Sequence, residues 1–198
     1  MDNLSTWIAG HWVEVAAAVI SIIYVILGVR QVKWLWGFGL ISAGLYAWVY
    51  GHSGFYAGMC LQGYYALISV YGWWNWNRKT PGTDKNGKLP VTNLPRKTGW
   101  ILSGVFVLLW AVIALILDQM TDSAIPIWDA LTTSGGIVAT WMLARKILQH
   151  WLVWIVVDFI SVGLYLWQGL YATTVLFVVY VIMAFVGYSQ WKKTMTGR

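Results

Sequence analysis

The residues best suited to bind a ligand lie on one face of a helix expected at positions 151–167. Trp151, Trp154, Asp158, Ser161 and Tyr165 follow one another at intervals of three and four residues, which places them on one helix face. In one interpretation, the two indoles enclose a flat, electron-poor ring and the carboxylate binds its positive charge or its hydrogen-bond donors. In the alternative, the carboxylate joins neighbouring helices and the indoles form part of an interfacial aromatic belt.

A second polar face is expected on the segment at positions 55–76. Gln62, Tyr65 and Ser69 recur there at the same three- and four-residue spacing. The Gln62 amide offers both donors and an acceptor to a ligand. An interhelical hydrogen bond worth about 0.6 to 2 kcal/mol is the competing role. Two further candidates, Ser42 and Tyr46, are expected to contact substrate or to pack between helices.

The composition shows which solvent surrounds these segments. Hydrophobic residues make up 59% of the 198 residues, charged residues only 10%, and the mean hydropathy is +0.63. Because soluble domains carry roughly a quarter charged residues, this chain requires a bilayer. A soluble enzyme, a nucleic-acid-binding protein and a disordered protein are thereby excluded. The single Cys60 forms no intrachain disulfide, and the scattered histidines, His11, His52 and His150, lack metal-ligand spacing.

Seven apolar runs are long enough to cross the roughly 30 Å hydrocarbon layer as helices. The fold class is therefore an all-α membrane protein. The expected spans are Val13–Val29, Trp34–Tyr50, Phe55–Trp76, Trp100–Leu117, Ile125–Leu143, Trp151–Trp167 and Tyr171–Tyr188.

Charge in the connecting segments predicts the orientation. With seven spans, all 13 Lys and Arg residues fall on one side of the membrane, and that side is the cytoplasmic one by the positive-inside rule. The N-terminus is therefore expected outside and the C-terminus in the cytoplasm. The long segment from Asn77 to Thr98 is expected to be a polar cytoplasmic linker.

The two sides of this linker resemble each other. The stretch from Ser42 to Trp48 matches the stretch from Ser161 to Trp167, which pairs Ser42 with Ser161 and Tyr46 with Tyr165. Further matches pair Tyr65, Gly72 and Trp76 with Tyr180, Gly187 and Trp191, and Glu14 with Asp129. The expected units are a first three-helix repeat (1–76), the linker (77–98), a connecting helix and outer loop (99–124) and a second repeat (125–198). An odd connector makes the two repeats parallel, an arrangement used by transporters with a substrate site between the halves.

These motifs resemble those of the Pnu-type vitamin transporters over about residues 12–193. The likeness rests on Trp151-x-x-Trp154 with an acid or amide at position 158, on Tyr71 to Trp76, and on Trp128-Asp129. The family is similar to the SWEET sugar carriers in its 3+1+3 helix plan. The resemblance implies facilitated diffusion of an unphosphorylated vitamin across the bacterial inner membrane, followed by trapping by a cytoplasmic kinase. It also implies that Trp151, Trp154 and position 158 line the site opposite Gln62.

The resemblance leaves two substrates in competition. The nicotinamide riboside pattern favours Asn at the positions of Ser42, Ser69 and Asp158, and a carboxylate in place of an amide suits a cation with an amino-heteroaromatic edge. Thiamine is therefore preferred and nicotinamide riboside is the alternative. A membrane enzyme using Asp158 is disfavoured because no second carboxylate, histidine or nucleophile shares its helix face. No cofactor and no nucleic-acid partner is expected, and the sequence leaves a homo-oligomer open.

Overall fold

In a computed structural model, the described part of the chain folds into seven helices. The structure describes residues 12–52, 56–78, 89–121 and 125–197, with the side chains of residues 12–18, 49–51 and 56–58 not described. The helices are α2 (Trp12–Val29), α3 (Leu35–His52), α4 (Tyr56–Asn77), α5 (Arg96–Met120), α6 (Pro126–Ala144), α7 (His150–Trp167) and α8 (Tyr171–Thr196). The predicted all-α fold is confirmed.

Two helices extend furthest beyond the predicted spans. Helix α5 already begins at Arg96, inside the predicted linker, and α8 runs on to Thr196. The added turns carry Arg and Lys residues, which are good helix formers and can extend a helix beyond the apolar layer. Helices α5, α7 and α8 are each long and apolar enough to cross a membrane, and α2 and α3 contain shorter apolar stretches.

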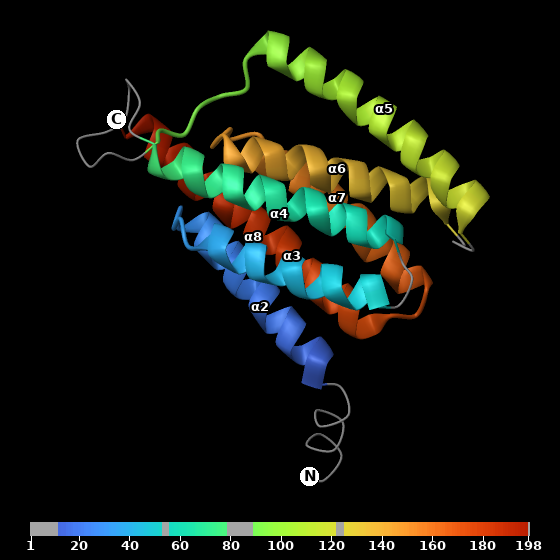
Figure 1. Ribbon diagram of the computed structural model, residues 1–198. Coiled ribbons are helices and arrows are strands. Elements are labelled where there is room, and N and C mark those ends of the chain that lie inside the picture. The colour runs from blue at the N-terminus through green and yellow to red at the C-terminus, as the bar shows by residue number, and fades with distance from the viewer. Residues whose placement is uncertain (1–11, 53–55, 79–88, 122–124, 198) are drawn as a thin grey trace.

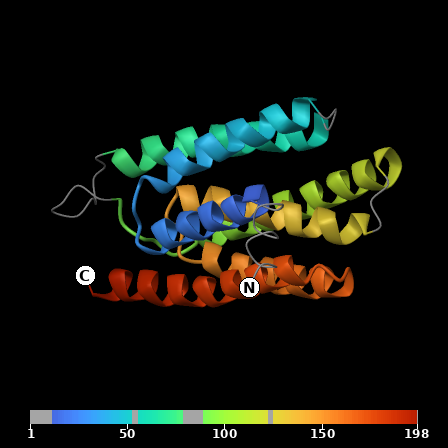
Figure 2. The ribbon, with the colours of Figure 1, turned by 90° about the horizontal axis from the view of Figure 1, so that it is seen from below.

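The helices form three layers. Helices α3 and α4 pack along each other on one side, and α7 and α8 do so on the other, with α2, α5 and α6 between them (Figures 1 and 2). The two halves meet twice in equivalent ways, because α2 packs against α8 and α6 packs against α4. Helix α5 connects the halves and packs against α6 alone among the described helices.

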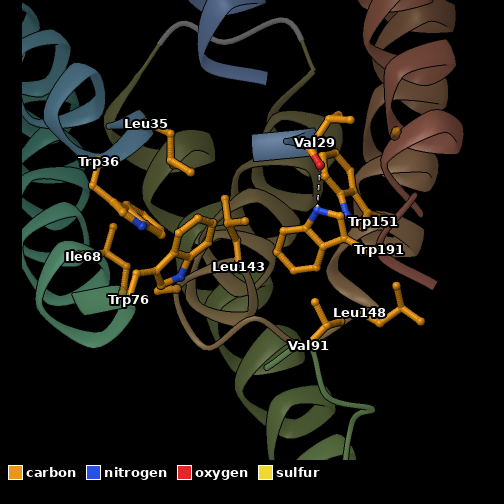
Figure 3. Close-up of a cluster of buried hydrophobic side chains, with 12 residues drawn as sticks. Val29, Leu35, Trp36, Ile68, Trp76, Val91, Leu143, Leu148, Trp151 and Trp191 are labelled. Carbon is orange, nitrogen blue, oxygen red and sulfur yellow. Dashed lines mark hydrogen bonds between the residues drawn. The ribbon is translucent and has the colours of Figure 1, made fainter. Parts of the chain in front are cut away.

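The same tryptophan–glycine contact occurs once in each half. A Cβ atom added to Gly72 would lie 2.4 Å from the indole of Trp36, and one added to Gly187 would lie 2.5 Å from the indole of Trp151. Trp76 of α4 packs edge to face on Trp36, with a centroid distance of 5.6 Å. Trp191 of α8 packs in the same way on Trp151, with a centroid distance of 5.8 Å. Figure 3 shows the two pairs on either side of Leu143. The internal repeat is therefore a repeat of packing.

This packing corrects the predicted pairing of α3 with α7. Trp36 and Trp151 are 115 positions apart, as are Gly72 and Gly187, and the ranges of α3 and α7 are related by the same separation. Ser161 is therefore equivalent to Tyr46, and Ser42 is not equivalent to Ser161. The similar sequences at Ser42–Trp48 and Ser161–Trp167 lie one helical turn out of register. The short motif was misleading because small and aromatic residues recur every turn along both helices.

The linker is packed against the protein at the end of the molecule that carries the basic residues. Thr92 forms a bridge with the loop between α6 and α7, donating its backbone N–H to the Lys146 carbonyl at 3.0 Å and accepting from the Leu148 N–H at 2.9 Å. Val91 is buried beside it. The part of the predicted linker from residue 89 to residue 94 is thus an ordered strap.

Lys146 joins this strap to both halves. Its side chain is only 2% exposed, and its ammonium donates to Gln31 Oε1 at 3.2 Å and to the Leu89 carbonyl at 3.1 Å. It also lies 4.5 Å from the centre of the Trp76 ring. Gln31 and Lys146 are equivalent in the repeat, and both have a positive φ, 55° and 53°. Each half therefore turns in the same way after its first helix.

Candidate functional site: two adjoining cavities between the halves

Two cavities lie between the halves and share part of their walls. The first has a volume of about 270 Å³ and lies among α2, α3 and α4, closed by one residue each from α6 and α7. The second has a volume of about 230 Å³ and lies among α2, α7 and α8, with one residue from α6. Ser21, Tyr24 and Trp154 line both cavities, so the two adjoin.

The second cavity contains the indoles and the carboxylate that the sequence placed on one helix face. Trp151, Trp154 and Asp158 all line it. Asp158 is 5% exposed and lies eight residues after the first residue of α7, about 12 Å along its axis. In the described part of the chain no Lys, Arg or His side chain forms an ion pair with this carboxylate.

The two indoles of this cavity are held differently. Trp151 is fixed by the core, because its ring meets Trp191 edge to face and lies 4.5 Å from the His150 ring. Trp154 is half-buried and lines both cavities. A Cβ atom added to Gly136 would lie 3.5 Å from the Trp154 ring. Gly136 thus allows α6 to lie close to this indole, in agreement with the packing role of small residues in membrane helices.

The first cavity collects the neutral polar candidates. Gln62, Tyr65 and Ser69 from α4 line it together with Ser42 and Tyr46 from α3. The Ser69 hydroxyl donates to the Tyr65 carbonyl at 2.7 Å, which leaves an oxygen lone pair available to a donor. Five of the ten predicted residues are therefore brought together here, beside Trp154.

Ser161 and Tyr165 line neither cavity. The Ser161 hydroxyl is buried and donates to the Val157 carbonyl at 2.9 Å, a bond within its own helix. The Tyr165 ring packs on Phe177, with a centroid distance of 5.0 Å. Both residues lie toward the end of α7 beyond Asp158, and their predicted contact with substrate stays a prediction.

Sequence reasoning missed several of the residues that line the cavities. The cavities are also lined by Ser21 and Tyr24 of α2, Thr140 of α6, His150 of α7, and Phe177 and Tyr180 of α8. Tyr180 could have been found, because the repeat pairs it with the candidate Tyr65. Under the repeat, Gln62 corresponds to Phe177, Ser69 to Ala184 and Ala43 to Asp158. At these equivalent positions the polar side chains of the first cavity are neutral, whereas the second cavity has an aromatic and an acidic side chain.

Comparison with known proteins agrees with this architecture. A solved structure described as the vitamin B3 transporter PnuC superposes with a TM-score of 0.75 over 99% of this chain and 87% of the other, at 22% sequence identity. The nicotinamide riboside transporter PnuC of Escherichia coli is 24% identical over 91% of this chain and 84% of its own length. The riboflavin/roseoflavin transporter RibM of Streptomyces davaonensis is 29% identical over the same shares.

The match to a family model covers nearly the whole chain. Residues 11–193 match the model described as nicotinamide mononucleotide transporter. The matched range contains all seven helices apart from the last residues of α8, and both cavities. The chain is therefore a multi-pass membrane protein that belongs to the nicotinamide mononucleotide transporter family, a family of transporters and not of enzymes.

Proposed function

We propose that this protein is a facilitator that carries a flat, cationic, unphosphorylated vitamin between its two halves, with thiamine as the preferred substrate. The observation that carries this proposal is the buried Asp158 carboxylate on a cavity wall shared with Trp151 and Trp154. Without a bound ligand, burying an ionised carboxylate at this depth costs free energy because the group is removed from bulk water. A cationic ring would supply the missing positive charge.

The indoles favour the same class of ligand. Aromatic faces attract cations through the ring quadrupole, with gains of about 2 kcal/mol when both groups are desolvated. The neighbouring cavity offers uncharged donors and acceptors from Gln62, Tyr46 and Ser42, which suit an amino-heteroaromatic edge or hydroxyl groups. Each cavity alone is small for a vitamin, since ligand sites commonly measure about 300–1,000 Å³. We therefore infer that one ligand occupies both.

Nicotinamide riboside is the second candidate, and a specific observation favours it. The relatives from Escherichia coli and Haemophilus influenzae, each 24% identical, are named as nicotinamide riboside transporters. Nicotinamide riboside is also a flat cation. Thiamine is preferred because it combines a positive thiazolium with an amino group that can donate to Asp158.

Ligand binding followed by tryptophan fluorescence tests the proposal. Thiamine, nicotinamide riboside and riboflavin are titrated separately into the purified protein, the Asp158→Asn variant and the matched Asp118→Asn variant, whose position lies on exposed α5 outside both cavities. Because a charge-assisted hydrogen bond contributes about 1.5–3 kcal/mol, Asp158→Asn should weaken thiamine by roughly 10- to 150-fold and nicotinamide riboside less. Equal losses for both would remove the preference for thiamine, and no quenching by any of the three would refute a vitamin substrate.

Transport without an energy source completes the proposal. Proteoliposomes loaded with unlabelled vitamin should take up labelled vitamin by exchange without ATP or an ion gradient.

The orientation that we propose, N-terminus outside and C-terminus cytoplasmic in a bacterial inner membrane, follows from the basic residues at one end of the helices. A cysteine at position 193 should therefore react with a membrane-impermeant thiol reagent only after cells are opened. After transport into the cell, the vitamin would be trapped by a cytoplasmic kinase.

A further inference from the structure

A third hollow lies outside the transport site, between α5 and the outer faces of α6 and α7. It measures about 440 Å³ and shares no lining residue with the two cavities. Its walls are almost wholly apolar, with Ser103 and Gln149 as its polar lining side chains. Because α5 and α7 are each long and apolar enough to cross a membrane, we expect the hollow to face lipid. We call it the α5 groove.

The groove exists because α5 packs against α6 and makes no contact with α7 in the described part of the chain. No residue of α5 is buried. Just past the middle of α5, the Trp110 indole N–H donates to the Ile127 carbonyl at 3.0 Å. Before its N-terminal end, the Leu94 N–H donates to Gln149 Oε1 at 2.8 Å. Between these two attachments α5 stands away from α7 (Figure 1), and side chains from the described part of the chain do not fill the space.

The length of the α5 groove matches one leaflet of a bilayer. Along α6 its lining runs from Leu131 to Met142. Eleven residues at about 1.5 Å each correspond to roughly 16 Å. The hydrocarbon layer is about 30 Å thick, so the groove spans about half of it, the depth reached by the acyl chains of one leaflet.

Basic side chains lie at one end of the α5 groove. Arg96 and Lys97 are exposed and lie in the chain between Leu94 and Gly99, which both line the groove. At the end of α6, the exposed Arg145 places its guanidinium 4.9 Å from the centre of the Trp141 ring. Trp141 packs in the apolar cluster that includes groove-lining Leu and Val side chains.

These three cations have no acidic neighbour in the described part of the chain. The described acidic residues lie elsewhere along the helices: one near the C-terminal end of α5, one in the first turn of α6 and one at the middle of α7, namely Asp118, Asp129 and Asp158. Among the described residues, three positive charges beside a leaflet-deep apolar groove thus lack an acidic partner. A lipid phosphate lies at this depth, where each nearby Lys or Arg contributes about 1 kcal/mol of attraction.

We propose that the α5 groove binds one anionic phospholipid of the basic-side leaflet, with an acyl chain between α5 and α7 and its phosphate at Arg96, Lys97 and Arg145. The lipid would fill the space between α5 and α7, which do not contact each other in the described part of the chain. This site is independent of the transported vitamin, because it shares no residue with the vitamin cavities.

Native mass spectrometry of the purified protein with phosphatidylglycerol or phosphatidylcholine of matched acyl chains tests the proposal. One phosphatidylglycerol should remain bound at concentrations where phosphatidylcholine dissociates. Replacing all three basic residues (Arg96→Gln, Lys97→Gln, Arg145→Gln) should weaken the first phosphatidylglycerol by roughly tenfold or more. Independently, Ser103→Phe should reduce its binding by occupying the groove, with every charge retained.

A matched triple variant serves as the control. Arg30, Lys192 and Lys193 are exposed cations at the same end of the protein, away from the α5 groove, and changing them to Gln removes the same charge. Phosphatidylglycerol binding should be unchanged in this control. Equal weakening in both triple variants, no preference for phosphatidylglycerol over phosphatidylcholine, or protection of the groove by a second copy of the chain would each overturn the proposal.

Discussion

Substituting Gly187 by alanine tests whether the tryptophan–glycine contacts both stabilise the halves and position the site. The added Cβ would lie 2.5 to 2.7 Å from three atoms of the Trp151 indole. Carbon atoms in contact are normally about 3.5–4.0 Å apart, so the ring or the helix must move by about 1 Å. The ring has little room to do so, because it is 4% exposed and is packed against Trp191 and His150.

The size of the effect follows from two opposing contributions. Overpacking a close-packed interior typically costs about 1–3 kcal/mol. Alanine in place of glycine within a helix returns up to about 1 kcal/mol. We therefore expect Gly187→Ala to lower the free energy of unfolding by about 1–2 kcal/mol. Because Trp151 also lines the second cavity, the displaced ring should lose part of its contact with a ligand, about 0.5–1.5 kcal/mol or roughly 2- to 12-fold in affinity.

The repeat supplies the control within the same molecule. Gly72→Ala makes the equivalent clash with Trp36, at 2.4 Å, but Trp36 lines neither cavity. The Gly72→Ala variant should lose a similar amount of stability and keep its affinity for the vitamin. Gly163→Ala, where a Cβ would meet nothing within 4 Å, should lose neither.

Unfolding in detergent and fluorescence titration of the three variants together measure both quantities. Equal affinity losses for Gly72→Ala and Gly187→Ala would refute the assignment of Trp151 to the site. Unchanged stability in both variants would refute the packing argument.

Three further substitutions test contacts at the basic end and between the halves. Lys146→Met removes two hydrogen bonds and a cation–π contact from a buried ammonium and should destabilise the protein by about 1.5–3 kcal/mol, whereas Lys193→Met on the exposed end of α8 should stay within about 0.5 kcal/mol in the same thermal-unfolding assay. Trp191→Phe leaves the last carbonyls of α2 without the indole donor that lies at 3.1 and 3.2 Å, and urea unfolding should show a loss of about 1–3 kcal/mol. Tyr64→Phe removes the 2.7 Å bond to the Ile137 carbonyl that links α4 to α6, and a loss outside about 0.5–1.5 kcal/mol would count against a simple hydrogen bond.

The sequence by itself determined the helices and the candidate face of α7. Apolar runs of membrane-spanning length can satisfy their backbone groups within bilayer only as helices or closed barrels, so their number and approximate limits follow from local composition. Trp151, Trp154 and Asp158 share a helix face for an equally local reason, the 3.6-residue period. The pairing of Gly187 with Gly72 was also visible, since a Tyr seven residues before and a Trp four residues after each glycine recur at the same separation along the chain.

Only the tertiary structure decided the register between the halves and the composition of the cavities. A motif that recurs every helical turn cannot distinguish alignments one turn apart, whereas the close approach of Trp36 to Gly72 and of Trp151 to Gly187 permits one register. Tyr24 lies in an apolar run without a distinguishing spacing, and its place on both cavities depends on how α2 packs between the halves. Helix and face are properties of neighbouring residues, but the depth at which two helices meet is set by side-chain volumes brought together from distant parts of the chain.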